Sequence, residues 1–600
     1  MDSNSRFHPS ETRPTLFTNF RDSTLESLVN HIGTKLQIDE KKRLHQTSPM
    51  GGLAFDVEGY DPPLVPIRSA PLFDSSETAA EAAEAYWMAL LRETNFDAFD
   101  NLHQPDIQAQ FPSTASAATL QDALNDLAKY AFFKNRNKAL IDPRKFWRAQ
   151  VPPSWLPESS ETYGSESFAG VGVGPYISQF LLRGTQLAEK KEVTPADGIV
   201  AFGPQRLSQK IVLGTEKQAY LTNQKDWAQV HGGDASKVGD TALDREPNFI
   251  RTLRDGASYV HFDEIYQEYL IAASIILSLI PRPGNTLRPE LHETDGTPKP
   301  GGGGQFVAES GQSFEYLNVG NPYRDSAAQN GFATFGVTHI LTLLAETSTR
   351  AHKAGWFHKW RIRRLRPEEF GARVHSERVN NPSPTTGRKP LYTIPHELLY
   401  GQGRNANGQL RSVVDLCADT QQGSFLLPQA FSEGCPTHPA YPSGHATVAG
   451  ASVTILKAMF NEDAEIDTYR LQNGALGISS RPDDPKTLKI GHELNKLASN
   501  ILFFRGFAGV HWRSDSIAGV LLGELVAIEL LVEQTMPSKN GTKFYRETLK
   551  NGGSPFFRLT TFKGEAIDIV DGAIRKVKPG RKPVYTFDEF AREHYAEAYA

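Results

Sequence analysis

The sequence contains few cysteines and no apolar run of the length that crosses a membrane. Cys417 and Cys435 are too few for a disulfide framework, although one bridge between them stays open. The longest apolar run, 270–280, is about half of what a membrane-spanning helix needs, and it has the spacing of a buried helix. No membrane anchor is therefore predicted.

Two further absences concern targeting and charge. No basic stretch at the N-terminus leads into an apolar core of signal-peptide length, so we expect the protein to stay inside the cell, in the cytoplasm. The chain has 64 Lys and Arg against 69 Asp and Glu, a net charge of −5, which lacks the positive excess of nucleic-acid-binding proteins. No nucleic-acid partner is predicted.

Alanine content and hydrophobic spacing predict a mainly α-helical protein. With 600 residues the chain exceeds the usual size of a single core, so one large elaborated domain or two or three fused layers are expected. For the architecture we expect two four-helix-bundle-like cores packed in one domain. Strands should be short and few, with a hairpin within 198–214. The predicted helices are 77–93, 120–133, 259–280, 335–366, 444–460, 492–504 and 514–533.

The chain divides into three parts by composition. Residues 1–50 are polar and rich in Pro, Ser and Thr, which is typical of an extended arm on the body or on a partner subunit. Residues 51–535 contain the predicted helices, with the candidate site within 350–520. Residues 536–600, rich in Lys, Gly and Pro, are interpreted as a C-terminal extension, an arm or tail without an assigned role.

The first candidate site motif is a basic segment, 359–366, with five cations in eight residues and no acid. Lys359 and Arg366 are seven residues apart, so on one helix they would share a face, and Pro367 should end that helix. A lysine and an arginine aimed at one spot suit an anion. The alternative is a solvated or partner-facing basic surface.

The second motif, Tyr-Pro-Ser-Gly-His at 441–445, is a turn that leads into a helix rich in small residues. Ser443 can offer a hydroxyl, and the N–H of Gly444 lies at a helix N-terminus, which favours anions. His445 can transfer protons near neutral pH. The alternative is that Ser443 only caps the helix and that the histidine is incidental.

The third motif is Arg505 followed by His511 and Asp515. Asp515 lies one helical turn after His511, so its carboxylate can accept a hydrogen bond from one imidazole nitrogen and leave the other free for an electrophilic centre. Arg505 adds another cation. The alternative is a helix cap at Ser514 or Asp515 beside a histidine that is merely buried.

Together the three motifs predict a binding site for a tetrahedral oxyanion. Three cations, neutral donors and a histidine that can act as ligand or nucleophile converge on one chemistry, and each charge-assisted hydrogen bond contributes about 1.5–3 kcal/mol. Phosphate and vanadate are the natural guests. A non-catalytic anion-binding or scaffold protein is the alternative from a different class.

The motifs resemble the K-x6-R-P, P-S-G-H and R-x5-H-x3-D signature shared by the type-2 phosphatidic acid phosphatase superfamily and the vanadium haloperoxidases. Phe504 departs from it, because many phosphatases have serine before the arginine. Further segments, among them Leu-Ala-Phe-Asp-Val-Glu-Gly at 53–59 and Tyr-Val-His-Phe-Asp at 259–263, are similar to the algal and cyanobacterial bromoperoxidases. The resemblance spans about residues 50 to 540.

The resemblance implies a vanadate cofactor, with His511 as the direct vanadium ligand beside Asp515 and with His445 as the acid/base group that assists peroxide binding. Lys359 would also polarise the bound peroxide. The residues that it implies for binding vanadate oxygens are Lys359, Arg366, Ser443, Gly444 and Arg505.

His438 matches a second histidine of the bromoperoxidases, which favours bromide, whereas Trp356 is similar to the fungal and brown-algal residue at that position. A structural His438 bonded to backbone and a core Trp356 are the alternatives.

The implied activity is oxidation of a halide by hydrogen peroxide, followed by halogenation of an organic acceptor, in a homo-oligomer, either a dimer or a dodecamer. The alternative within the superfamily is an acid phosphatase with His511 as the nucleophile. His292, Glu293 and Asp295 are candidates for a structural divalent cation site, although such groups in a loop are usually solvated.

Overall fold

The computed structural model describes most of the chain. The described residues are 65, 67–100, 120–134, 146–148, 168–185, 194–233, 239–280, 316–324, 331–401, 411–536, 555–577 and 584–595. The predicted N-terminal arm and the candidate cation residues His292, Glu293 and Asp295 lie outside them.

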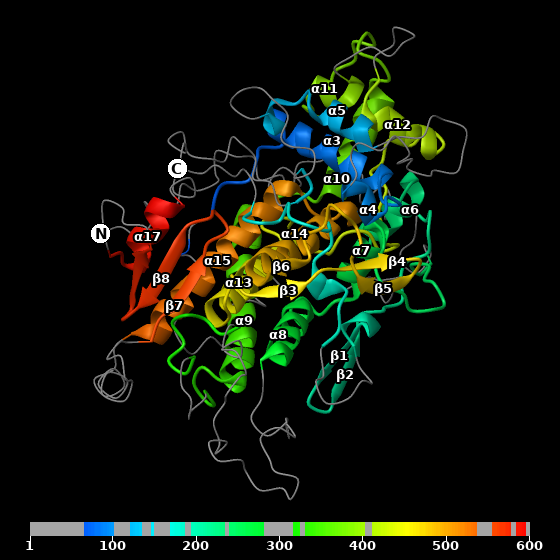
Figure 1. Cartoon of the computed structure of the whole chain (residues 1–600). Helices are drawn as coiled ribbons and strands as arrows, with labels where there is room; N and C mark the ends of the chain where they lie inside the picture. The colour runs from blue at the N-terminus through cyan, green and yellow to red at the C-terminus, as the bar shows by residue number, and fades with distance from the viewer. Residues whose placement is uncertain are drawn as a thin grey trace, which may run out of the picture.

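Four long helices form the bundle that carries the candidate site. α13 (Gly444–Met459) packs along α15 (Arg513–Thr535), and α9 (Val337–Ile362) and α14 (Ile490–Ala508) flank this pair (Figure 1). All residues of α13 except His445 and all of α14 except His492 are buried, as expected for helices at the centre of a large protein. α8 (Gln267–Leu279) packs against α9 and α13 at one side.

A second group of helices surrounds α3 (Ser76–Leu90), which contacts α14 and thereby joins the bundle (Figure 1). The predicted mainly α-helical fold with two helical cores is confirmed. The helices around α3 are α5 (Leu120–Leu127), α10 (Pro367–Asn380), α11 (His396–Tyr400) and α12 (Val413–Thr420). Other short helices are α4 (Phe96–Asp100), η5 (Ala131–Phe133), η9 (Gln179–Leu181), η10 (Pro195–Asp197) and α6 (Gln224–His231).

The predicted helix 259–280 is two helices. α7 (Leu253–Phe262) ends at Asp263, which has an extended backbone, and α8 begins after Ile265, whose φ of 34° is left-handed. A β-branched residue rarely adopts that conformation, so the apolar periodicity across 259–280 gave no sign of the break. The four-residue link 263–266 lies beside the candidate site.

The prediction that Lys359 and Arg366 share one helix was wrong. α9 ends at Ile362, where Arg363 takes a left-handed conformation with φ of 55°, and Arg366 is the N-cap of α10. Pro367 is therefore the first residue of a new helix, where its fixed φ and missing N–H are favourable, rather than the end of the previous one.

The strands are short and antiparallel. β1 (Ile199–Phe202) and β2 (Gln205–Ser208) form the predicted hairpin, with Ile199 paired to Ser208. Two other pairs are β3 (Glu465–Asp467) with β6 (Thr487–Lys489), and β4 (Tyr469–Gln472) with β5 (Ala475–Ile478).

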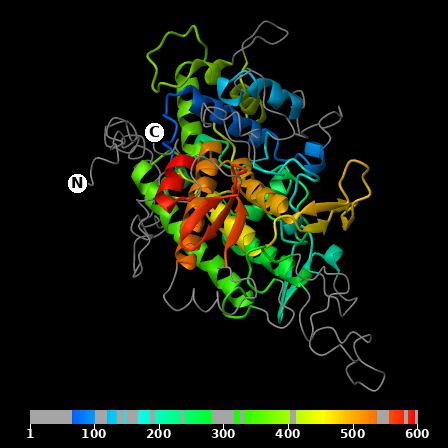
Figure 2. The same ribbon diagram turned by 60° about the vertical axis from the view of Figure 1, so that its left-hand side comes forward.

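The C-terminal extension contains a three-stranded sheet of β7 (Phe557–Thr560), β8 (Ala566–Val570) and β9 (Ala573–Lys576), followed by α17 (Phe587–His594). The sheet lies across α13 and α15 (Figure 2), and the buried Lys457 of α13 donates a hydrogen bond to the carbonyl of Thr560. The described part of the extension is thus packed on the bundle. None of the helices in the described ranges is long and apolar enough to cross a bilayer.

Glycines allow α13 and α15 to approach closely. A Cβ at Gly450 would lie 2.0 Å from the carbonyl oxygen of Val520, and one at Gly523 would lie 1.9 Å from that of Thr447. Neither distance is possible for real atoms, so both positions require glycine unless the helices move apart.

We expect Gly450→Ala to destabilise the protein by about 1–3 kcal/mol, because the added methyl group would force α13 away from α15. The measurement is the midpoint of urea denaturation. Gly477→Ala is the matched control, since a Cβ there meets no atom within 4 Å. A midpoint for Gly450→Ala equal to that of the parent protein would contradict this account of the packing.

Candidate active site

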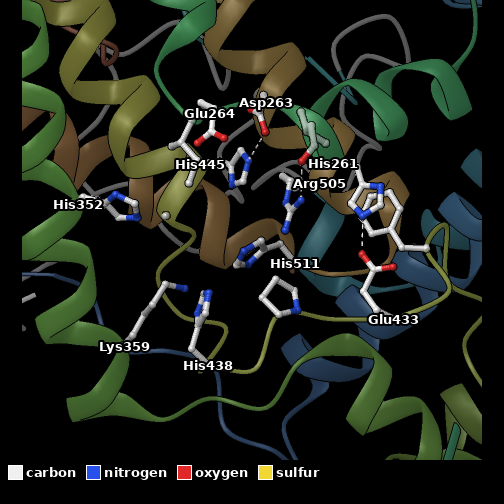
Figure 3. Close-up of a pocket in the computed structure, with 16 residues that line it drawn as sticks. His261, Asp263, Glu264, His352, Lys359, Glu433, His438, His445, Arg505 and His511 are labelled. Carbon is white, nitrogen blue, oxygen red and sulfur yellow. Dashed lines mark hydrogen bonds and ion pairs between the residues drawn. The ribbon is translucent and has the colours of Figure 1, made fainter. Parts of the chain in front are cut away.

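The three sequence motifs meet at one pocket beside the N-terminus of α13 (Figure 3). Six of the predicted site residues line it: Lys359, His438, Gly444, His445, Arg505 and His511. Arg366 contacts His511 and His438, Ser443 precedes Gly444, and Asp515 lies behind His511. Trp356 packs on His438, with ring centroids 5.0 Å apart. All ten predicted site residues therefore belong to the pocket or to its immediate support.

His511 is fixed in one tautomer by its contacts. Its Nδ1 lies 3.0 Å from Asp515 Oδ2 and donates to it, so Nε2 is the unprotonated nitrogen. Arg366 Nη1 donates to Nε2 at 2.9 Å. Burial, then the charges of the neighbouring cations, lowers the pKa of His511 well below its usual range. The imidazole is thus neutral, with a lone pair on Nε2.

Asp515 is the link between His511 and the rest of the fold. Its Oδ2 also accepts from the N–H of Trp512, and its Oδ1 accepts from Arg364 at 2.9 Å. Arg364 in turn donates to Glu81 of α3 at 2.7 Å. This chain of buried hydrogen bonds connects the helical group around α3 with the imidazole of the site.

Three cations surround His511, and backbone carbonyls hold them. Lys359 Nζ donates to Pro439 and Ala440 at 2.9 and 3.1 Å, which leaves one ammonium hydrogen. Arg505 Nη1 donates to Val260 at 2.7 Å, while its buried Nε has no partner among the described residues. The site therefore retains buried donors that an anion can satisfy.

The cations lower one another's pKa. Burial, then the charge of Arg366, lowers the pKa of Lys359 well below its usual value, and burial lowers the pKa of Arg505 to about 10. Arg505 keeps its charge at neutral pH. Because like charges at this depth repel with little solvent screening, a bound anion would relieve them.

The N-terminus of α13 adds neutral donors. Ser443 caps the helix, its Oγ accepting from the N–H of Ala446 at 3.4 Å, which is the structural alternative considered above. Its hydroxyl hydrogen is still a donor. Gly444 lines the pocket as the first residue of the helix, where a backbone N–H has no partner within the helix.

His445 is oriented by Asp263, a residue that the sequence analysis did not assign. Its Nε2 lies 3.0 Å from Asp263 Oδ1 in the link between α7 and α8 (Figure 3). Burial lowers the pKa of His445, and the charge of Asp263 opposes that effect. The only hint in the sequence was that Asp263 ends the segment similar to bromoperoxidases.

Other pocket residues that sequence reasoning missed include His261, His352 and Glu433. His261 forms an ion pair with Glu433 and stacks on Phe431, with centroids 3.8 Å apart. No spacing rule relates these residues, because they come from three separate segments. His261 and Glu433 lie on the opposite side of the pocket from Lys359 and His438, whereas His352 lies on the same side as Lys359 (Figure 3).

His438 bonds to a site residue rather than to backbone alone. Arg366 Nη2 lies 3.1 Å from His438 Nδ1, and Arg366 Nε donates to the carbonyl of His438. Burial, then the charge of Lys359, lowers the pKa of His438 far below its usual range, so the ring is neutral. Trp356 is absent from the pocket lining, and it supports His438 from behind.

Comparison with known proteins shows which family this chain belongs to. The chain is 33% identical over 538 residues to the vanadium-dependent bromoperoxidase of Corallina pilulifera, covering 86% of this chain and 78% of that protein. It is 27% identical to that of Ascophyllum nodosum, covering 82% of this chain and 73% of that protein. The chain belongs to the vanadium-dependent bromoperoxidase family.

Two further matches agree with this membership. Residues 414–536 match the family described as the VCPO second helical-bundle domain. The solved homohexameric second vanadate-dependent bromoperoxidase of Ascophyllum nodosum has the same fold, with a TM-score of 0.65, 23% identity and coverage of 96% of this chain and 85% of that one. The resemblance expected from the motifs is confirmed.

The residues of this bromoperoxidase family member fit vanadate. The unprotonated Nε2 of His511 is a suitable ligand atom for an electrophilic metal centre, and no described residue supplies an acceptor to the buried Nε of Arg505. Three cations and a helix N-terminus suit the oxygens of a tetrahedral oxyanion.

We expect Arg505→Met to weaken binding of orthovanadate roughly 10- to 100-fold, because one charge-assisted hydrogen bond to the anion is lost. Isothermal titration calorimetry on protein dialysed free of phosphate measures this. Arg361→Met, which changes a cation of the basic segment 359–366 outside the pocket, is the control and should bind like the parent. If Arg505→Met bound orthovanadate as tightly as the parent protein does, Arg505 would not be a vanadate-binding residue.

Proposed function

We propose that the protein is a vanadate-dependent haloperoxidase that oxidises a halide, preferentially bromide, with hydrogen peroxide to a hypohalous-acid equivalent. The observation that carries this proposal is the neutral His511, whose unprotonated Nε2 accepts from Arg366 amid three buried cations, in a chain of the bromoperoxidase family. The final acceptor is an organic compound that becomes halogenated.

In this proposal His511 is the protein ligand of vanadium, and Asp515 keeps its Nε2 unprotonated by accepting from Nδ1. The residues that would hold the vanadate oxygens are Lys359, Arg366, Ser443, Gly444 and Arg505. Bound vanadate supplies a Lewis acid that activates peroxide without itself changing oxidation state.

His445 is the proposed acid/base group. Asp263 holds its Nε2, so Nδ1 is the nitrogen that can exchange a proton with peroxide in the pocket. Its lowered pKa keeps the ring neutral, and therefore able to accept that proton, down to pH values below its ordinary 6.5.

Lys359 and the two arginines stabilise negative charge that develops on oxygen. Their donors are fixed by backbone carbonyls before any substrate binds, so little reorganisation is needed during the reaction. Lys359 has one ammonium hydrogen left for a peroxide oxygen. The same preorganisation would polarise the oxygen that the halide attacks.

His438 and Trp356 are the proposed halide-side residues. The ring of His438 is neutral and lies between Arg366 and Trp356 at the pocket wall, where positive potential attracts an anion. We further propose a homo-oligomer, since the solved Ascophyllum relative is a homohexamer. A dimer or a dodecamer, as expected from the sequence, remains a prediction.

The defining test is bromination of a phenolic dye by hydrogen peroxide, using phosphate-free protein with and without orthovanadate. We expect vanadate-dependent turnover, and a loss of at least about 1,000-fold in His511→Ala, which lacks the proposed ligand. His492→Ala, which changes a histidine outside the pocket, should retain activity. No bromination beside hydrolysis of a phosphate monoester would instead indicate the phosphatase.

The role of His445 predicts a pH profile. Because the neutral ring accepts the proton, kcat/KM for peroxide should fall as the pH drops through the lowered pKa of His445, below 6.5. Asp263 raises that pKa, so Asp263→Asn should move the acidic limb to lower pH and reduce the plateau. Asp463→Asn, an exposed carboxylate, is the control. An unmoved limb in Asp263→Asn would contradict the assignment.

A further inference from the structure

Glu81 is a buried glutamate of α3 that the proposed mechanism leaves without a role. Its Oε2 accepts from Arg364 Nη2 at 2.7 Å and from Ser514 Oγ at 2.9 Å, and its Oε1 accepts from the N–H of Ser514 at 2.6 Å. A carboxylate removed from water needs such donors to remain stable. Glu81 therefore fixes the positions of Arg364 and of the first turn of α15.

Arg364 and Ser514 connect Glu81 with Asp515. Nη1 of Arg364 donates to Ser514 Oγ at 2.5 Å and to Asp515 Oδ1 at 2.9 Å. The planar guanidinium thus spans two carboxylates, with one nitrogen directed at each. Asp515 Oδ2 accepts from His511 Nδ1 at 3.0 Å. Glu81 consequently reaches the proposed vanadium ligand through two intervening side chains.

The charges along this path leave Asp515 a strong acceptor. Arg364 carries a permanent positive charge, which is shared between the carboxylates of Glu81 and Asp515. If Glu81 were neutral, the whole charge of Arg364 would act on Asp515 and draw its electron density toward Oδ1. Oδ2 would then accept more weakly from His511.

We propose that Glu81 is a positioning residue for His511 and that it favours vanadate over phosphate in the site. It acts through Arg364, which holds Asp515 against His511 Nδ1. This rests on the proposed role of His511 as the vanadium ligand. Vanadium in orthovanadate can accept a nitrogen ligand, whereas phosphate binds through its oxygens alone. Because the cations bind the oxygens of either anion, only vanadate gains from a well-oriented, electron-rich Nε2.

Glu84 offers a matched control on the same helix. It lies one turn after Glu81 and is buried as well. Arg513 Nε donates to its Oε2 at 3.0 Å, and Trp147 Nε1 donates to its Oε1 at 2.9 Å. Loss of the charge of Glu84 therefore reproduces the general destabilisation expected at Glu81, without changing the guanidinium that donates to Asp515.

The first measurement is the NMR resonance of the His511 Nδ1 proton in the full chain without vanadate, assigned by its loss in His511→Ala. A strong hydrogen bond to a carboxylate moves such a proton to low field. In Glu81→Gln we expect it to move to higher field, because Asp515 accepts more weakly, and in Glu84→Gln we expect the parent position. An unmoved resonance in Glu81→Gln, or equal shifts in both variants, would overturn the proposal.

The second measurement compares the affinity of the site for orthovanadate and for inorganic phosphate, by isothermal titration calorimetry. We expect Glu81→Gln to bind orthovanadate roughly 10-fold more weakly. Its affinity for phosphate should not fall, since the three cations are unchanged. Glu84→Gln should bind both anions like the parent. Parallel losses for both anions in Glu81→Gln would indicate a distorted site and contradict the role of Glu81.

Glu81→Asp decides the question if Glu81→Gln does not fold. Aspartate keeps the charge but is one methylene group shorter, so it reaches Arg364 and the N–H of Ser514 less well. We expect the His511 proton and the affinity for orthovanadate to change in the same directions as in Glu81→Gln, by smaller amounts. Parent values for both quantities in Glu81→Asp would be incompatible with a positioning role.

These outcomes are distinct from a failure of the proposed function. If the parent lacks vanadate-dependent bromination, the haloperoxidase proposal fails, and the resonance of His511 still tests the path from Glu81. If the parent brominates but Glu81→Gln keeps the parent's resonance and its ratio of affinities, only the role of Glu81 is overturned.

Discussion

The hydrogen bond from His511 Nδ1 to Asp515 is the interaction on which the site depends. It fixes the tautomer and leaves Nε2 unprotonated, so that this nitrogen accepts from Arg366. Asp515 is itself held by the N–H of Trp512 and by Arg364, and Arg364 reaches Glu81 on α3. The two helical groups therefore share one buried polar network, and any displacement of α3 against the bundle would change the orientation of the imidazole.

The site places positive charge in the protein interior, which is energetically unfavourable. Lys359, Arg366 and Arg505 are almost fully buried around one imidazole. Burial, and then the charges of neighbouring cations, lowers the pKa values of His511 and Lys359. Backbone carbonyls, rather than acidic side chains, satisfy most of their donors. Carbonyls hold the cations in place without neutralising them, so the positive potential remains available for an anion and its reactions.

Contacts between residues close together in the sequence could be predicted, whereas contacts between distant residues could not. The bond between His511 and Asp515 followed from a spacing of one helical turn, and the helical bundle followed from periodicity. Arg366 contacts His511 as the N-cap of α10 and not from the helix of Lys359 as predicted, because α9 ends before a left-handed Arg363 and Pro367 begins a new helix. Asp263 could not be assigned, since its partner is 182 residues away.

His445 and His511 show why contacts between residues far apart in the sequence matter for function. Burial lowers the pKa of both, but only His445 faces a carboxylate whose charge opposes burial strongly, whereas Asp515 mainly orients His511 among cations. One ring is thereby kept as a ligand and the other near the point where it can exchange protons. The difference arises from the break between α7 and α8, which brings Asp263 to His445. An unbroken helix over 259–280 would keep the same residues but would lose the second, proton-transferring environment.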